Sequence, residues 1–285
     1  CFKPLSFISR IRMGILVLAS KFIKDYSAFE TITAKEWIIK NSGLQVWEKI
    51  WEPLIKSKFD VDSDNISGTW IWNKLKLRGS SRGKNLNNEM LGYLDGSFNR
   101  IVEIMAEKIH RSGGSILFDN EVTAIIKNEN GSFDIEAKNH KGNYDKVLFT
   151  GSPALLGNIL QGPYSKYRCF LSQIRYKANI CAILELSESL SPYYWITVAQ
   201  NDLPFVLIIE HTNLVGLREY NSHIVYLSRY LDISDPLYSA SDDEIINEFI
   251  NGLKKVFPNL NQHIIKNITI SRAPFAQPVI TTGYS

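Results

Sequence analysis

The sequence predicts a mixed α/β fold, of the α+β kind, with helices, a small β-meander and a mostly antiparallel sheet. Apolar residues recur at helical spacing in the first hundred residues. Short segments of alternating polarity, separated by glycine-containing turn signals, then predict strands between 115 and 150. Longer segments of the same kind follow from 179 to 230 and predict a second sheet, which gives the order helices, meander, sheet.

Residues 1–89 are expected to be the helical part of one domain. The first helix carries an apolar stripe and is expected to be buried or partly interfacial; the stripe is Ile8, Ile11, Ile15, Leu18 and Phe22. A capping box, Thr33-Ala-Lys-Glu36, begins a later helix that Gly43 ends. The tryptophan-rich stretch from Trp47 to Trp72 fits either core packing or one wall of a large apolar pocket.

Residues 90–153 are expected to form a distinct unit. An amphipathic helix over 98–110 ends at Gly113-Gly114, a typical helix terminator. Asn130-Gly131 is a turn signal between two of the expected strands. The strands of this unit are expected at 91–94, 115–119, 122–126, 132–138 and 146–150.

Residues 154–285 are expected to carry the sheet of the first domain. Ser241 is a suitable N-cap for an amphipathic helix over 242–257, and Pro258 ends it. The tail over 272–279 reads as irregular. The strands are expected at 179–186, 194–199, 205–210, 223–230 and 264–271.

Composition excludes several classes of function. The chain has 285 residues and a formal net charge of +3 with no basic stripe, which argues against a nucleic-acid partner. The three cysteines form no CxxC pair, so neither a metal site nor a disulfide framework is indicated; Cys169 and Cys181 are expected in the core, in a reducing, cytoplasmic compartment. The apolar run from Met13 to Ala19 is too short to span a bilayer.

No standard catalytic motif is present. The sequence contains no GxGxxG, no GxxxxGK[ST], no HExxH and no GxSxG. The five histidines are scattered, and strand alternation would put Glu210 and His211 on opposite faces, so a surface or core role is expected for each histidine. No single residue of the sequence can therefore be assigned a catalytic role.

The order of several short segments is more informative. They are Gly92-Tyr-Leu-Asp-Gly96, Gly113-Gly-Ser-Ile116, Asn120-Glu-Val-Thr-Ala-Ile125, Tyr144-Asp-Lys-Val-Leu-Phe-Thr150 and Ala273-Pro-Phe-Ala-Gln-Pro278. In this order they resemble the superfamily of FAD-dependent amine oxidases, protoporphyrinogen oxidases and phytoene desaturases. The resemblance covers nearly the whole chain. It implies the substrate-binding lobe of a two-domain oxidoreductase, with a β-meander that belongs to the FAD domain.

The resemblance also implies cofactor-binding positions. Val122 would lie beside the adenine and bind it through backbone groups, while Thr150 and Gly151 would end a strand near the adenosine. Gly92 and Gly96 would let the backbone pass close to the flavin and the substrate. Ser97 stands where relatives usually have a second glycine, which puts a positive φ at that position in doubt.

The chain begins after the GxGxxG unit of such proteins and stops before their last flavin-binding segment. FAD is therefore expected in the parent protein, and the chain alone is expected to be colourless and inactive. The parent would remove hydride from a small organic substrate, apolar or amphipathic, and the exposed apolar surface predicts self-association.

Two alternatives remain. One is a binding or interaction module that keeps the fold without catalysis. The other is a flavin-dependent sugar mutase, which would need arginines facing a diphosphate; the candidates by residue type are Arg168, Arg175, Arg218, Arg229 and Arg272.

Overall fold

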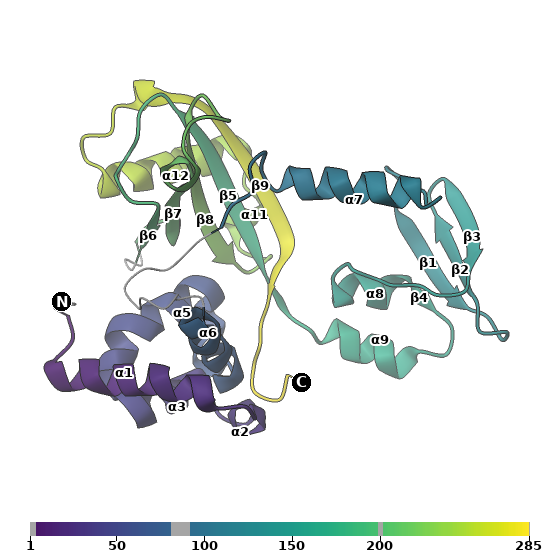
Figure 1. The fold of residues 1–285 in the computed structure, drawn as a ribbon, viewed down its shortest axis with the longest axis horizontal. Helices are drawn as coiled ribbons and strands as arrows, with labels where there is room; N and C mark the ends of the chain where they lie inside the picture. Colours follow the sequence, from purple (N-terminus) through teal and green to yellow (C-terminus); the bar gives the residue numbers. More distant parts are fainter. Residues whose placement is uncertain (1–3, 81–91, 199–201, 285) are drawn as a thin grey trace. The chain divides into compact units, whose positions relative to one another are not determined.

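The computed structural model describes residues 4–80, 92–198 and 202–284. The chain divides into two compact units (Figure 1). The larger unit combines Cys1–Gly92 with Tyr176–Ser285, and the smaller unit is Tyr93–Arg175.

The first part of the larger unit is helical, as expected. Its helices are α1 (Phe7–Phe22), α2 (Ser27–Glu30), α3 (Ala34–Ser42), α4 (Leu44–Val46), the π-helix η1 (Trp47–Trp51), α5 (Glu52–Phe59), the 3-10 helix η2 (Asp60–Asn65) and α6 (Gly68–Ser80). The predicted capping box begins α3: the Glu36 amide donates to Thr33 Oγ1 at 3.2 Å, and the Thr33 amide donates to Glu36 Oε2 at 2.9 Å. Gly43, with φ 90°, ends this helix.

The tryptophans of this part are core residues. Trp37, Trp47, Trp51 and Trp72 are all buried in one cluster with aliphatic residues from the same helices. Phe59 packs edge-on against Trp70, with ring centroids 5.1 Å apart. Of the two interpretations left open by the sequence, core packing is the one the structure bears out.

The sheet of the larger unit is antiparallel throughout. Its strand order is β6-β7-β8-β5-β9. The strands are β5 (Tyr176–Leu186), β6 (Trp195–Thr197), β7 (Leu207–Glu210), β8 (His223–Leu231) and β9 (Ile265–Pro278). The intervening short helices are α10 (Thr212–Val215), α11 (Pro236–Ser239) and η3 (Gln262–Ile264).

Helix α12 (Asp242–Val256) packs against the sheet (Figure 1). Ser241 caps it as predicted, in a capping box with Glu244. Its apolar face, which includes Phe249 and Leu253, forms one core cluster with inward residues of β5 and β8. The tail after 271 is not irregular as expected: β9 continues to Pro278, because a bulge between Lys177 and Asn179 lets β5 pair with it to the end.

The smaller unit holds one helix, a meander and a helical pair. Its strand order is β3-β2-β1-β4, with β1 and β4 parallel and the other pairs antiparallel. The elements are α7 (Asn99–Arg111), β1 (Val122–Lys127), β2 (Phe133–Ala137), β3 (His140–Tyr144), α8 (Pro153–Ile159), β4 (Leu160–Gln161) and α9 (Ser165–Ser172).

The unit ends later than the sequence suggested. Residues 154–175, assigned by sequence to the sheet-bearing part, belong to the smaller unit. The reason is that β4 pairs with β1 through Ile125 and Leu160, which holds α8 and α9 beside the meander. The expectation that residues 115–150 stand apart from the sheet at 179–230 agrees with the two separate sheets.

Three expected strands are not formed in the described residues. Residues 92–94, 115–119 and 146–150 have no ladder, while Leu91 lies outside the described residues. A strand needs a neighbour for its backbone N–H and C=O groups, and the described part of the chain offers none here. Several large apolar side chains of these segments are exposed, including Leu117, Phe118 and Leu148.

Two helical glycines lead to a paired stability prediction. A Cβ at Gly252 in α12 would stand 2.6 Å from Pro204 Cδ, whereas a Cβ at Gly14 in α1 meets nothing within 4 Å. We expect Gly14→Ala to stabilise the fold by about 0.5–1 kcal/mol through helix propensity. We expect Gly252→Ala to destabilise it by about 1–2 kcal/mol, because overpacking outweighs the same gain. Urea unfolding of both variants measures the difference, and equal shifts would contradict this packing.

Candidate functional site

Val122 lies at the open end of a strand edge in the smaller unit. It starts β1 and pairs with Ala137 of β2 on one side. On the other side, β4 pairs with β1 only at Ile125 and Ile126, so no strand of the described residues faces Val122 there. A backbone edge left open in this way can accept hydrogen bonds from a planar base. The geometry around Val122 therefore fits the role that the resemblance implies.

Thr150 and Gly151 lie just before α8 and are exposed. A Cβ added to Gly151 would stand 2.7 Å from Cζ of Phe149. A larger residue at position 151 would therefore displace the Phe149 ring. The small size of Gly151 has a local role without a cofactor, and the implied adenosine contact remains a prediction.

The Gly96-Ser97 turn resolves the doubt about Ser97. Gly96 has φ 84° and Ser97 has φ 65°, so both residues adopt the left-handed conformation. Ser97 Oγ accepts a hydrogen bond from the Asn99 amide at 3.2 Å, which offsets part of the cost of this conformation. Gly92 is exposed, and a Cβ there would meet nothing within 4 Å.

The larger unit contains a cavity of about 520 Å³ between its helical part and β8. Its lining mixes charged, polar and aliphatic groups: Pro53, Lys56, Ser57, Asp60, Val61, Ser63, Asp64, Val198, Leu203, Val206, Arg229 and Tyr230. None of the core tryptophans belongs to the lining. The expected wall of tryptophans is therefore absent from this cavity, although Tyr230 contributes an aromatic ring. The mixed lining suits an amphipathic ligand better than a purely apolar one.

A buried ion pair lies next to this lining. The Lys177 ammonium, with only 1% of its side chain exposed, stands 2.9 Å from Asp62 Oδ2 and 3.9 Å from Asp232 Oδ2. Asp62 belongs to η2 and Lys177 to β5, so the pair joins the helical part to the sheet. Nearby, Lys58 Nζ lies 5.2 Å from the centroid of the Tyr230 ring. Burial, with a smaller contribution from Lys74, lowers the pKa of Lys58.

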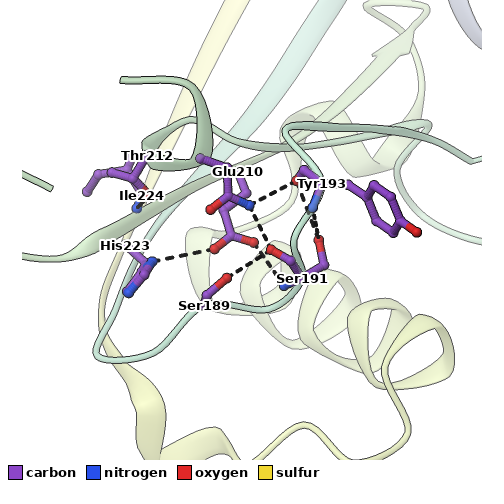
Figure 2. A network of polar contacts seen from close by, with 8 residues as sticks. Ser189, Ser191, Tyr193, Glu210, Thr212, His223 and Ile224 are labelled. Carbon is purple, nitrogen blue, oxygen red and sulfur yellow. Dashed lines mark hydrogen bonds and ion pairs between the residues drawn. The ribbon is translucent and has the colours of Figure 1, made fainter. Parts of the chain in front are cut away.

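A second polar network surrounds Glu210 at the end of β7 (Figure 2). Glu210 is 2% exposed; its Oε2 accepts from the Ser191 amide at 3.1 Å, and its Oε1 lies 3.5 Å from His223 Nδ1. Thr212 Oγ1 accepts from the Ile224 amide at 3.2 Å. Asn213 donates to the carbonyl oxygens of Ser191 and Tyr193. The network thus ties the loop before β6 to the start of β8.

His211 is a core histidine within this region. Its Nε2 lies 3.2 Å from the Tyr220 hydroxyl, and the Tyr226 ring packs edge-on against the imidazole. Burial lowers its pKa, which favours the neutral ring. Glu210 and His211 are both buried although they are adjacent, because β7 ends at Glu210 and the rings of Tyr220 and Tyr226 pack against the His211 imidazole.

Sequence reasoning missed both polar clusters. A glutamate after the apolar run Leu207–Ile209 was the one available signal for the Glu210 network. The partners of Lys177 are more than fifty residues away in sequence, so no local pattern could reveal them.

The cysteines separate into two environments. Cys181 is half-buried rather than fully in the core, and burial raises the pKa of its thiol to about 11. Cys169 is exposed on α9, so the expectation of a core position was wrong for it. Its neighbours on that helix face solvent because α9 buries only Leu171.

The five candidate arginines have different surroundings. Arg229 lines the cavity and pairs with Asp235 at 3.6 Å. Arg272 is engaged at the start of α12, where it bonds Asp242 and the carbonyl oxygens of Tyr238 and Ala240. Arg168, Arg175 and Arg218 are exposed. In the residues that the structure describes, there is no group of acidic, histidine and cysteine side chains that could hold a metal ion.

A family model for flavin containing amine oxidoreductases matches residues 1–285. The chain belongs to this family. The match covers the open edge at Val122, the cavity and the buried ion pair alike. The superfamily resemblance drawn from the sequence is thereby confirmed.

Solved structures agree with this fold. A protein assigned as a protoporphyrinogen oxidase from Exiguobacterium sp. 255-15 has a TM-score of 0.72 at 16% identity, over 99% of this chain and 63% of that one. A reduced UDP-galactopyranose mutase gives 0.68 at 13% identity, over 98% and 62%. Putrescine oxidase bound to putrescine gives 0.65 at 13% identity, over 99% and 66%. At such identities the likeness concerns the fold alone.

The chain thus spans about two thirds of the length of these structures. Among curated proteins, none matches it. No helix in the described parts of the chain is both long and apolar enough to cross a membrane.

The buried ion pair gives a second prediction. We expect Lys177→Met to destabilise the larger unit by about 3–5 kcal/mol, because the Asp62 carboxylate keeps its burial and loses its cation. Adding Asp62→Leu should recover most of this loss. The exposed Lys35–Asp64 pair, at 3.0 Å, is the matched control.

For the control, Lys35→Met should cost about 1 kcal/mol or less. Denaturant unfolding of the single and double variants measures the coupling. Equal losses for Lys177→Met and Lys35→Met would show that burial of the first pair does not matter to the fold.

Proposed function

We propose that the chain is the substrate-binding portion of an FAD-dependent oxidoreductase, together with part of its flavin-binding domain. The parent enzyme would remove hydride from a small organic substrate, in the cytoplasm. The family match over the whole chain is the observation that carries this proposal.

The surface of the smaller unit supports it. Helix α7 buries none of its residues within the described chain, although Ile101, Ile104, Met105 and Ile109 share one face. The segments 115–119 and 146–150 have strand-like sequences and pair with no strand of the described residues. We infer that further strands of the flavin-binding domain pair with these segments and that α7 packs against them.

The residues of this chain would contact only part of the FAD molecule. The edge at Val122 would bind the adenine, and the turns at Gly96 and Thr150 would lie along the cofactor. The chain's own sequence supplies no GxGxxG turn for the pyrophosphate. When bound, the flavin supplies the hydride acceptor. The residues of this chain would bind the substrate and exclude water from it.

The cavity beside β8 is our candidate for substrate contact. Lys56 and Arg229 contribute positive charge and Asp60 and Asp64 negative charge. Apolar surface comes from Val198, Leu203 and Val206. We propose an amphipathic substrate on this basis.

The mutase alternative keeps one supporting observation, the position of Arg229 in the cavity. It is weakened because Arg168, Arg175 and Arg218 are exposed and Arg272 is engaged elsewhere. A non-catalytic module would have the same fold without flavin.

The absorbance spectrum of the purified protein separates these readings. We expect the 285-residue chain to be colourless and the whole protein that contains it to show the visible bands of bound flavin. Val122→Ala in the whole protein should keep its FAD, because the proposed contact is through the backbone. A whole protein without flavin would favour the non-catalytic module.

A further measurement distinguishes oxidoreductase from mutase. An oxidoreductase bleaches its flavin bands when substrate is added without oxygen, since hydride moves to the flavin. A mutase leaves the redox state of its flavin unchanged over a turnover. Bleaching by an amine or another reduced organic substrate supports the proposal, and turnover of a nucleotide sugar with no net reduction contradicts it.

A further inference from the structure

Helix α1 buries the less apolar of its two faces. It packs on the helical part through Leu16 and Ser20, with Met13 and Val17 half-buried on the same side. The sequence suggested a helix that is buried or partly interfacial; within the described residues the stripe from Ile8 to Phe22 is exposed, so the first of these two alternatives is contradicted. The cause is that neighbouring helices, chiefly α6 and α3, contact the opposite side of α1.

The outward face is a continuous apolar stripe. At 100° per residue, six large side chains fall within one third of the helix circumference. They are all exposed, and the most exposed is Phe22 at 82%; the six are Phe7, Ile8, Ile11, Ile15, Leu18 and Phe22. A stripe of this size is far more apolar than an ordinary exposed helix face.

On α1 itself only basic charges flank this stripe. Residues 4–24 contain no aspartate or glutamate, and Asp25 is the first acidic residue of the chain. Arg10 and Lys21 lie along one border of the stripe and Arg12 along the other, and Lys24 follows the helix. The Arg12 side chain lies at the end of α3, where it donates hydrogen bonds to the carbonyl oxygens of Lys40 and Asn41. Arg10, Lys21 and Lys24 form no ion pair within the described residues.

A cavity of about 370 Å³ lies beside the basic border. Lys21 of α1 and Lys76 of α6 both line it, together with Trp72, Asn73 and Leu77. Lys76 stands 4.5 Å from the centroid of the Trp72 ring. The ammonium groups of Lys21 and Lys76 would attract an anionic group, and the Trp72 and Leu77 side chains would contact an apolar chain attached to it.

We propose that α1 lies on the surface of a bilayer that contains anionic phospholipids. Its stripe enters the interface, and Arg10, Lys21 and Lys24 meet the lipid phosphates. The helix has 16 residues and a length of about 24 Å, less than the hydrocarbon thickness, so it lies in the plane of the membrane.

The charges decide against a second copy of the chain as the occupant. A two-fold contact through the stripe would bring two sets of basic flanks together, with no carboxylate in either helix to compensate. Anionic lipid headgroups, in contrast, would neutralise the basic residues beside the stripe. The proposal does not depend on the flavin chemistry proposed above.

Vesicle flotation of the whole protein tests it, with phosphatidylcholine vesicles with and without phosphatidylglycerol. We expect binding only to the anionic vesicles, weakening as salt is added. The triple variant Ile11→Ser, Ile15→Ser, Leu18→Ser should lose about tenfold or more of its binding. Arg10→Gln with Lys21→Gln and Lys24→Gln should bind weakly too.

The matched control replaces three other exposed aliphatic residues of the same unit: Leu214→Ser, Leu217→Ser and Ile233→Ser. It should bind as the unchanged protein does, and circular dichroism verifies that each variant is folded. Equal binding by the stripe variant and the control would overturn the proposal. So would absence of binding, or a dimer that the stripe variant dissociates while no vesicle binds.

Discussion

The hydrogen-bonding edge of β1 is the constraint on which the account depends. In the larger unit's sheet each described strand pairs with at least one neighbour in the chain, and the outer edges of β6 and β9 have no strand partner among the described residues. In the smaller unit, β4 covers only two residues of β1. Backbone groups that have no partner in the fold need another one, whether a further strand, a ligand or water. The open edge of β1 therefore affects both how the sheet of this unit is completed and where the adenine is proposed to bind.

The sequence predicted most elements whose partners lie within the chain. The capping boxes at Thr33 and Ser241 are formed, because such caps depend on residues three positions apart. The helix ending at Gly113-Gly114 is also present. The failures at 115–119 and 146–150 have one cause: their strand-like sequences lack neighbours here, and periodicity carries no information about neighbours.

The candidate site was less predictable. The segments that resemble the family pointed to Val122 and Gly96. In the structure Val122 lies at an open strand edge and Gly96 has a positive φ, and both are compatible with the roles that the resemblance implies. Lys177 and Asp62 meet across more than a hundred residues, so their pairing is a property of the tertiary fold. For α1 the sequence left a buried and a partly interfacial helix open for the same reason, since the pattern shows that a face is apolar but does not show what covers it.

Hydrogen exchange of backbone amides tests the central claim most directly. In the 285-residue chain, the amides of 115–119 and 146–150 should exchange rapidly while those of β2 are protected by β1 and β3. In the whole protein with flavin bound, both segments should gain protection, as should the residues around Val122. Protection of these segments already in the chain alone, or none in the whole protein, would contradict the account.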